Sequence, residues 1–124
     1  MYAEQMMKRE RSLLLDKSEH FSGRIIKMYQ YLVNNKNEQV ISKQVLRSGT
    51  SVGANVTEGR NAQSKADFIH KLNIALKEAD ETIYWLKNLH IGGYINDKEF
   101  KSIHTDAEEL VKILVSSIKT LKGQ

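Results

Sequence analysis

The segment that decides the fold is Arg47-Ser48-Gly49-Thr50-Ser51-Val52-Gly53-Ala54-Asn55-Val56-Thr57-Glu58-Gly59. The sequence around it has a helical pattern, yet each glycine inside a helix costs about 1 kcal/mol relative to alanine. Gly49 and Gly53 are one turn apart, so a helix places them on one face, where a neighbouring backbone can approach closely. We therefore expect this face to pack tightly, either on the next helix along the chain or on a neighbouring subunit.

The whole chain has 124 residues and contains neither proline nor cysteine. That length suits one domain with a real core, and the absence of proline is typical of an all-helical protein, because proline interrupts helix interiors. Without cysteine there is no disulfide and no thiolate metal ligand, which suits a reducing cytoplasm. No run approaches about 18 consecutive apolar residues, so we expect a cytoplasmic protein that does not span a membrane.

Apolar residues recur at helical spacing in four stretches, at about 16–34, 38–58, 65–91 and 97–121. The connections between them are short, which predicts an all-α, antiparallel up-down-up-down four-helix bundle in a single domain covering residues 1–124. The first twelve residues are either a flexible tail or an extension of the first helix.

Capping residues mark where these helices begin and end. Asp16, Ser64 and Asn96 each stand three residues before a carboxylate, which is the spacing of an N-terminal cap. A fourth start is expected near Asn37-Glu38. The expected stops are Gly59 and the pair Gly92-Gly93, of which the pair can adopt the left-handed cap.

The third and fourth helices each carry a second apolar row beside their core row. Its members are Ile69, Leu76 and Ile83 on the third helix, and Val111, Ile113, Val115 and Ile118 on the fourth. One row suffices for an intramolecular core, so the second row either widens the core or faces another subunit. We favour the second alternative, because leaving such a row exposed would invite aggregation. The expected assembly is a closed homo-oligomer.

Patterns of catalytic or metal-binding residues are weak. Four-helix bundles hold di-iron sites with Glu-x-x-His pairs, and here only Asp67-Phe68-Ile69-His70 comes near that pattern. Asp67 is better explained as part of a helix cap. No arginine is followed four to six residues later by a histidine, as in helical RNA nucleases, and Ser48 and Ser51 lack a base close by in sequence. We expect no enzyme activity, no metal and no cofactor.

A row of polar side chains follows one face of the helix at 38–58. Arg47, Ser51, Asn55 and Glu58 are spaced to share that face. With a turn near residues 61–62, an antiparallel helix brings position 47 opposite position 77. Arg47 is therefore expected beside Glu78 or Glu81. We interpret these six residues as a polar network that specifies the fold, rather than as a catalytic or binding site.

These residues also carry a resemblance to a known family. Leu46-Arg47-Ser48, Ser51, Asn55, Glu58-Gly59, Ala75-Leu76-Lys77-Glu78-Ala79, Glu81, Tyr84-Trp85-Leu86 and Gly93-Tyr94-Ile95 closely resemble the bacterial four-helix-bundle proteins encoded in intervening sequences of 23S rRNA genes. That family is similar to the accessory variability determinant of diversity-generating retroelements, a pentameric barrel with a basic surface. The resemblance covers about residues 20 to 120. It implies a ring, with a homopentamer as the best guess, and a role with nucleic acid.

The formal net charge of +4 raises two functional alternatives. The first is an oligomer that binds RNA, an RNA-containing complex or DNA through phosphate contacts. Its candidate residues are Lys8, Arg9, Arg11, Arg24, Lys27, Lys43, Arg60 and Lys65. The second is a structural adaptor ring that recruits a protein partner, and a weaker third is a small-ligand binder in the bundle interior. Clustering of the cations at one rim favours nucleic acid, whereas scatter favours the adaptor.

Overall fold

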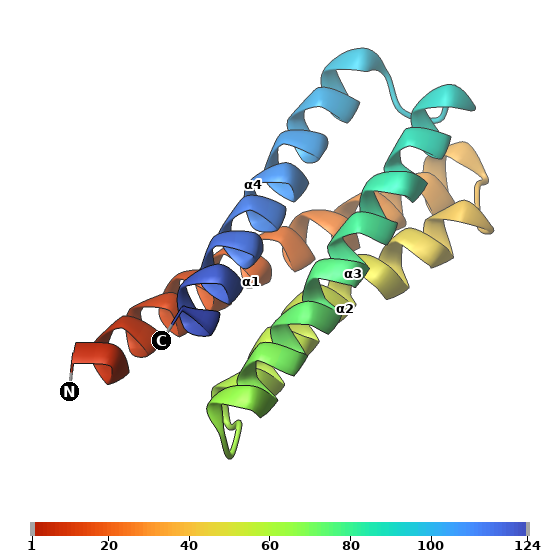
Figure 1. The fold of residues 1–124 in the computed structure, drawn as a ribbon. Coiled ribbons are helices and arrows are strands. Elements are labelled where there is room, and N and C mark those ends of the chain that lie inside the picture. Colours follow the sequence, from red (N-terminus) through yellow and green to blue (C-terminus); the bar gives the residue numbers. More distant parts are fainter. Residues whose placement is uncertain (1, 124) are drawn as a thin grey trace.

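The computed structural model describes the backbone of residues 2–123 and the side chains of residues 8, 9 and 11–123. Its four helices are α1 (Tyr2–Lys36), α2 (Ile41–Arg60), α3 (Lys65–Ile91) and α4 (Asp97–Lys122), with no strand in the described residues. Successive helices run in opposite directions, and α1 also packs on α4 (Figure 1). The predicted all-α antiparallel four-helix bundle is confirmed. None of these described helices is long and apolar enough to cross a membrane.

The first helix begins much earlier than its capping pattern indicated. Residues 2–15 belong to α1, so the expected start at Asp16 is wrong. Leu14 is fully buried in the core. Its burial stabilises the protein only if the helix already includes residue 14, and this favours a start before Asp16. Ser18 is likewise buried, and its Oγ donates a hydrogen bond to the carbonyl oxygen of Leu15 at 3.2 Å. The first twelve residues, as far as they are described, extend the helix.

The connection between α1 and α2 is built by Asn37 and Glu38. Asn37 has a φ of 55°, in the left-handed region that asparagine tolerates, and the Glu38 amide then donates to the carbonyl of Leu32 at 3.0 Å. The Glu38 carboxylate accepts three amides of the first turn of α2, from residues 40, 41 and 42, at 2.6 to 3.0 Å. Glu38 is thus a cap outside the helix, and α2 starts three residues later than predicted.

Gly59 was expected to end α2, but it does not. The helix continues to Arg60, and the Asn61 amide donates to the carbonyl of Glu58. Gly59 instead serves the contact with α3, because a Cβ there would lie 3.1 Å from the ring of Phe68. Its small size, rather than its conformational freedom, is what the structure uses.

The remaining caps follow local signals. Ser64 accepts the amide of Asp67 at 3.1 Å and begins α3. Asn96 and Glu99 form a reciprocal capping box that begins α4. Gly93 has a φ of 79°, and the Tyr94 amide beyond it donates to the carbonyl of Leu89 at 2.9 Å, which ends α3 in the left-handed cap.

The small face of α2 packs against α1. A Cβ on Gly49 would lie 2.9 Å from both Cγ atoms of Ile25, and one on Gly53 would lie 3.3 Å from the Ser22 hydroxyl and 3.6 Å from Ser18. The expectation that this face meets the next helix or another subunit is therefore wrong. The contacts of α2 with α3 are made instead by Arg47, Ser48 and Gly59.

The second apolar row of α3 and α4 widens the core of the single chain. Ile69, Leu76, Ile83, Val111 and Ile113 are partly buried and pack against the core, and Ile118 is buried. Val115 alone in this row is exposed. The row therefore accounts for part of the core of one chain, and a contact of its half-buried side chains with another subunit stays a prediction.

Candidate functional site

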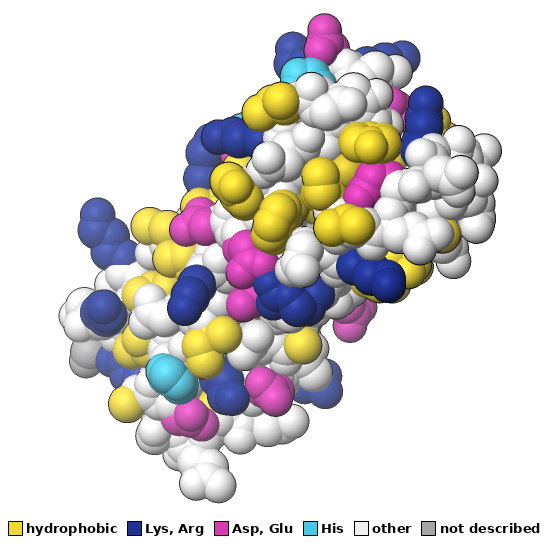
Figure 2. Space-filling view, turned by 90° about the vertical axis from the view of Figure 1, so that its right-hand side faces the viewer, with side chains coloured by type: hydrophobic (Ala, Val, Ile, Leu, Met, Phe, Trp, Pro, Cys, Tyr) yellow, Lys and Arg dark blue, Asp and Glu magenta, His cyan; other side chains and the backbone are white. Residues whose placement is uncertain are grey.

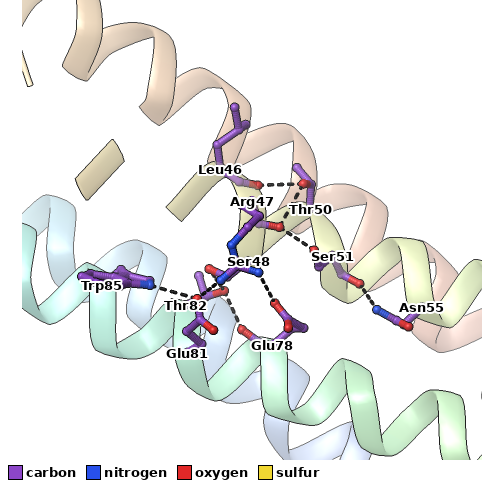
Figure 3. Close-up of polar contacts among 10 residues, drawn as sticks. All are labelled: Leu46, Arg47, Ser48, Thr50, Ser51, Asn55, Glu78, Glu81, Thr82 and Trp85. Carbon is purple, nitrogen blue, oxygen red and sulfur yellow. Dashed lines mark hydrogen bonds and ion pairs between the residues drawn. The ribbon is translucent and has the colours of Figure 1, made fainter. Parts of the chain in front are cut away.

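Arg47, in the second turn of α2, reaches across to α3 (Figure 3). Its Nη1 donates to Oε2 of Glu78 at 3.1 Å, and its Nη2 donates to Oε2 of Glu81. The same Glu81 oxygen accepts the Trp85 indole N–H at 3.1 Å. The geometry thus brings together three of the six residues of the expected polar network, Arg47, Glu78 and Glu81, and adds Trp85 to them.

The side chains of the other three members of the expected network do not contact the Arg47 guanidinium. The Ser51 hydroxyl donates to the backbone carbonyl of Arg47 at 2.6 Å, and the Asn55 amide donates to that of Ser51 at 2.8 Å. Both side chains therefore bond the preceding turn of their own helix. Glu58 pairs with Lys71 of α3 at 3.3 Å, about three turns along α2 from Arg47.

A buried hydroxyl pair between α2 and α3 had not been anticipated. Thr82 Oγ1 and Ser48 Oγ are 2.8 Å apart, and both residues are completely buried. Because Ser48 and Thr82 each stand in an apolar row, their polar groups must find a partner inside the bundle. The sequence did contain a signal for this pair, because each of the two facing apolar rows includes one hydroxyl residue.

At this α2–α3 contact an exposed cation meets a shielded carboxylate. Half of the Arg47 side chain is exposed, whereas the Glu78 side chain is only 16% exposed. The guanidinium therefore neutralises a carboxylate that the bundle partly desolvates. No group of three or more His, Cys, Asp or Glu side chains in the described part of the chain is arranged to hold a metal ion.

The eight candidate cations do not form one cluster. Five of them, Lys8, Arg9, Arg11, Arg60 and Lys65, belong to the start of α1 and to the α2–α3 connection, which lie at the end of the bundle that carries both termini (Figure 1). The Arg11 guanidinium stacks 4.7 Å from the centre of the Phe68 ring. Lys43 belongs to the first turn of α2, at the opposite end.

Arg24 and Lys27 lie between these two ends, on α1. Arg24 is held by α4, since its Nη1 donates to Asp106 at 2.8 Å and its Nη2 to the Ser102 hydroxyl at 2.8 Å. It is thus committed to an internal ion pair rather than open to a phosphate. Lys27 is exposed on the side of a groove between α1 and α4.

The terminal end as a whole has an excess of positive charge. Residues 2–12, 58–71 and 112–123, which meet there, contain nine lysines and arginines against four aspartates and glutamates. The rest of the chain contains ten basic and eleven acidic residues. The net positive charge of the protein therefore originates at one end of the bundle, and Lys112, Lys119 and Lys122 of α4 contribute to it.

The fold and these contacts define a small antiparallel helical-bundle protein with one basic end. The family model described as 23S rRNA-intervening sequence protein matches residues 10–116, so the chain belongs to that family. A crystal structure of a protein of unknown function from the S23 ribosomal protein family of Bacteroides thetaiotaomicron VPI-5482 is 53% identical, with a TM-score of 0.87. The similarity covers 89% of this chain and 98% of that one. No curated protein matches the chain.

Proposed function

We propose that this protein is a non-enzymatic, oligomeric nucleic-acid-binding protein, and that its basic end contacts the phosphates of RNA or of an RNA-containing complex. The observation that carries this proposal is the excess of nine basic over four acidic residues where the two termini and the α2–α3 connection meet. Such a surface attracts a polyanion and releases its condensed counterions on binding.

The contacts are proposed to be with phosphate rather than with bases. Phe68, near Arg11, is completely buried, and no described Phe, Tyr or Trp side chain at this end is exposed for stacking. Binding should therefore be weakly selective for sequence. Lysine and arginine contacts of this kind make the affinity fall steeply with salt, with a logarithmic slope of about −0.7 per contact on single strands and about −0.9 on duplex DNA.

We further propose a closed homo-oligomer, with five subunits as the best estimate. Exposed apolar side chains outside the basic end support self-association: Val40 is 77% exposed, Tyr84 57% and Ile91 82%. Hydrophobic side chains gather in the upper half of the face shown in Figure 2. A ring of five would carry a formal charge of about +20, which strengthens the field for phosphate.

The adaptor ring is the second candidate function. It is favoured by the same exposed apolar side chains, because Tyr84, with Trp85 edge-on at 5.0 Å, is of the residue type that dominates protein interfaces. In that case the protein would recruit a protein partner through this surface, and nucleic acid would not bind.

Fluorescence anisotropy separates the two functions. Labelled single- and double-stranded RNA and DNA are titrated at several salt concentrations against the wild-type protein, the Arg60→Glu/Lys65→Glu variant and a Lys43→Glu/Lys87→Glu control with the same charge change. We expect the first variant alone to lose about tenfold or more in affinity and to have a shallower salt slope. Absence of binding at micromolar wild-type protein would reject the proposal in favour of the adaptor.

Light scattering tests the assembly. A pentamer of 14.2 kDa chains has a mass of about 71 kDa. A mass near that of one chain at micromolar concentration would refute assembly, and a dimer would refute the ring.

A further inference from the structure

A groove of about 790 Å³ runs along the seam between α1 and α4. On α1 its wall extends from His20 to Tyr31, which corresponds to about 16 Å of helix, and on α4 it extends from Lys98 to Asp106. α1 and α4 pack less closely than the other three neighbouring pairs of helices, which leaves this seam open. The groove is therefore elongated and parallel to two helices, the shape that accepts a third helix.

The floor of the groove is apolar. Ile95 and Ile103 belong to the buried core, and Met28 packs against it from α1. Tyr31, at the end of the groove, is 38% exposed and presents an aromatic ring with a polar tip. These four side chains are suited to the leucine-like residues on the apolar face of an amphipathic helix.

The charges of the groove leave a positive rim. Asp106 is paired with Arg24, and the Glu99 carboxylate accepts the amide of Asn96 in the capping box of α4. Lys27 and Lys98 are exposed on opposite walls, and neither pairs with any described side chain. A ligand that enters the groove therefore meets two unpaired ammonium groups.

The geometry points to a docking site for an acidic amphipathic helix of another protein, whose apolar face covers the floor and whose glutamates or aspartates reach Lys27 and Lys98. Charge complementarity commits the site to an acidic occupant. A phosphate backbone has no apolar face to cover the floor formed by Met28, Ile95 and Ile103, so the occupant is a protein helix. This inference does not depend on nucleic-acid binding, which is assigned to other residues.

The test uses a designed, fluorescein-labelled helical peptide of about 18 residues, with leucines along one face and glutamates flanking them. A second peptide has lysine in place of each glutamate. Both are titrated by anisotropy against the wild-type protein, Lys27→Glu/Lys98→Glu, and the control Lys43→Glu/Lys87→Glu. We expect saturable binding of the acidic peptide, at least about tenfold weaker binding of the basic one, and about tenfold loss in the groove variant alone.

Amide NMR shifts locate the bound peptide. We expect the shift changes caused by the peptide to be concentrated in residues 20–31 and 98–106. Circular dichroism checks that the variants remain folded. No saturable binding, equal losses in the groove variant and its control, or shifts mapping elsewhere would overturn the inference. A change in light-scattering mass caused by the groove variant would assign the groove to a second copy and would also overturn it. Retained nucleic-acid binding by the groove variant separates this outcome from failure of the phosphate proposal.

Discussion

Substitution of Gly49 by alanine should destabilise the bundle even though alanine favours helices. The helix-propensity gain is about 1 kcal/mol. Against it, the new Cβ would lie 2.9 Å from Cγ1 and Cγ2 of Ile25 and 3.3 Å from its Cβ, closer than such carbon atoms approach each other. Overpacking of this kind costs about 1 to 3 kcal/mol. The expected net change ranges from about neutral to about 2 kcal/mol of lost stability.

Gly23 provides a matched control for this prediction. It lies within α1, and a Cβ there would meet nothing within 4 Å, so Gly23→Ala should gain the full propensity term of about 1 kcal/mol. Urea denaturation followed by far-UV circular dichroism and by Trp85 fluorescence, at one fixed protein concentration, gives both free energies of unfolding. The difference between the two alanine variants isolates the overpacking energy.

A double-mutant cycle with Ile25→Ala identifies the clashing atoms. Ile25→Ala alone should cost about 2 to 5 kcal/mol, because it leaves a cavity under α2. In that background both Cγ atoms are gone and only the Cβ at 3.3 Å remains, so Gly49→Ala should recover most of the gain expected for Gly23→Ala, which gives a coupling of about 1 to 3 kcal/mol. If Gly49→Ala in the wild-type background stabilised as much as Gly23→Ala, with no coupling to Ile25, the close packing of α2 on α1 would be refuted.

Three further substitutions test other contacts. Gly53→Leu should lower the free energy of unfolding by about 1 to 3 kcal/mol in the same urea assay, since its Cβ alone would be within 3.6 Å of Ser18; an unchanged midpoint would mean that this face is free. Glu38→Ala should cost about 1 to 2 kcal/mol, because three amides at the start of α2 lose their acceptor, and Glu38→Gln should restore part of that loss. Hydrogen bonding and charge from Glu109, 2.7 Å away, raise the pKa of the Lys17 ammonium above its ordinary 10.5. This contribution to stability is complete below pH 10.5 and is lost as the pH rises through the raised value, so Glu109→Gln should return the Lys17 pKa, measured by NMR titration, toward 10.5.

The starts of α3 and α4 were predictable from their local caps, whereas the start of α1 was not. Ser64 and Asn96 accept amides three residues later, and α3 and α4 start next to them. Asp16 has the same spacing to Glu19, but the burial of Leu14 extends the helix past it. A cap stabilises a helix by about 1 kcal/mol, whereas burying a leucine contributes about 1.5 to 3 kcal/mol. The burial of Leu14 therefore determines where α1 begins.

Of the candidate polar network, only the contacts between α2 and α3 were predictable from the sequence. An antiparallel turn places position 47 opposite the segment that contains Glu78 and Glu81, and Arg47 has a side chain long enough to reach both. Ser51 and Asn55 are too short, and their polar groups bond backbone carbonyls of their own helix instead. Regular spacing along one helix face therefore identifies residues that share a direction, but side-chain length determines which of them form a network.

The basic end could not be seen in any window of the sequence. Segments 2–12, 58–71 and 112–123 are far apart in the chain, and each has an excess of only one to three positive charges. The up-down-up-down topology brings them to the same end, where the excesses add (Figure 1).

The summed positive charge of this end also links the proposed nucleic-acid binding to the proposed ring. A ring with a single rotation axis repeats every subunit in the same orientation, so all basic ends lie on one side and their fields sum. In a dihedral assembly they would be divided between two opposite sides, each with half of the charge. A strong salt dependence with one nucleic-acid strand bound per oligomer would therefore favour the cyclic ring, and two independent strands per oligomer would favour the dihedral arrangement.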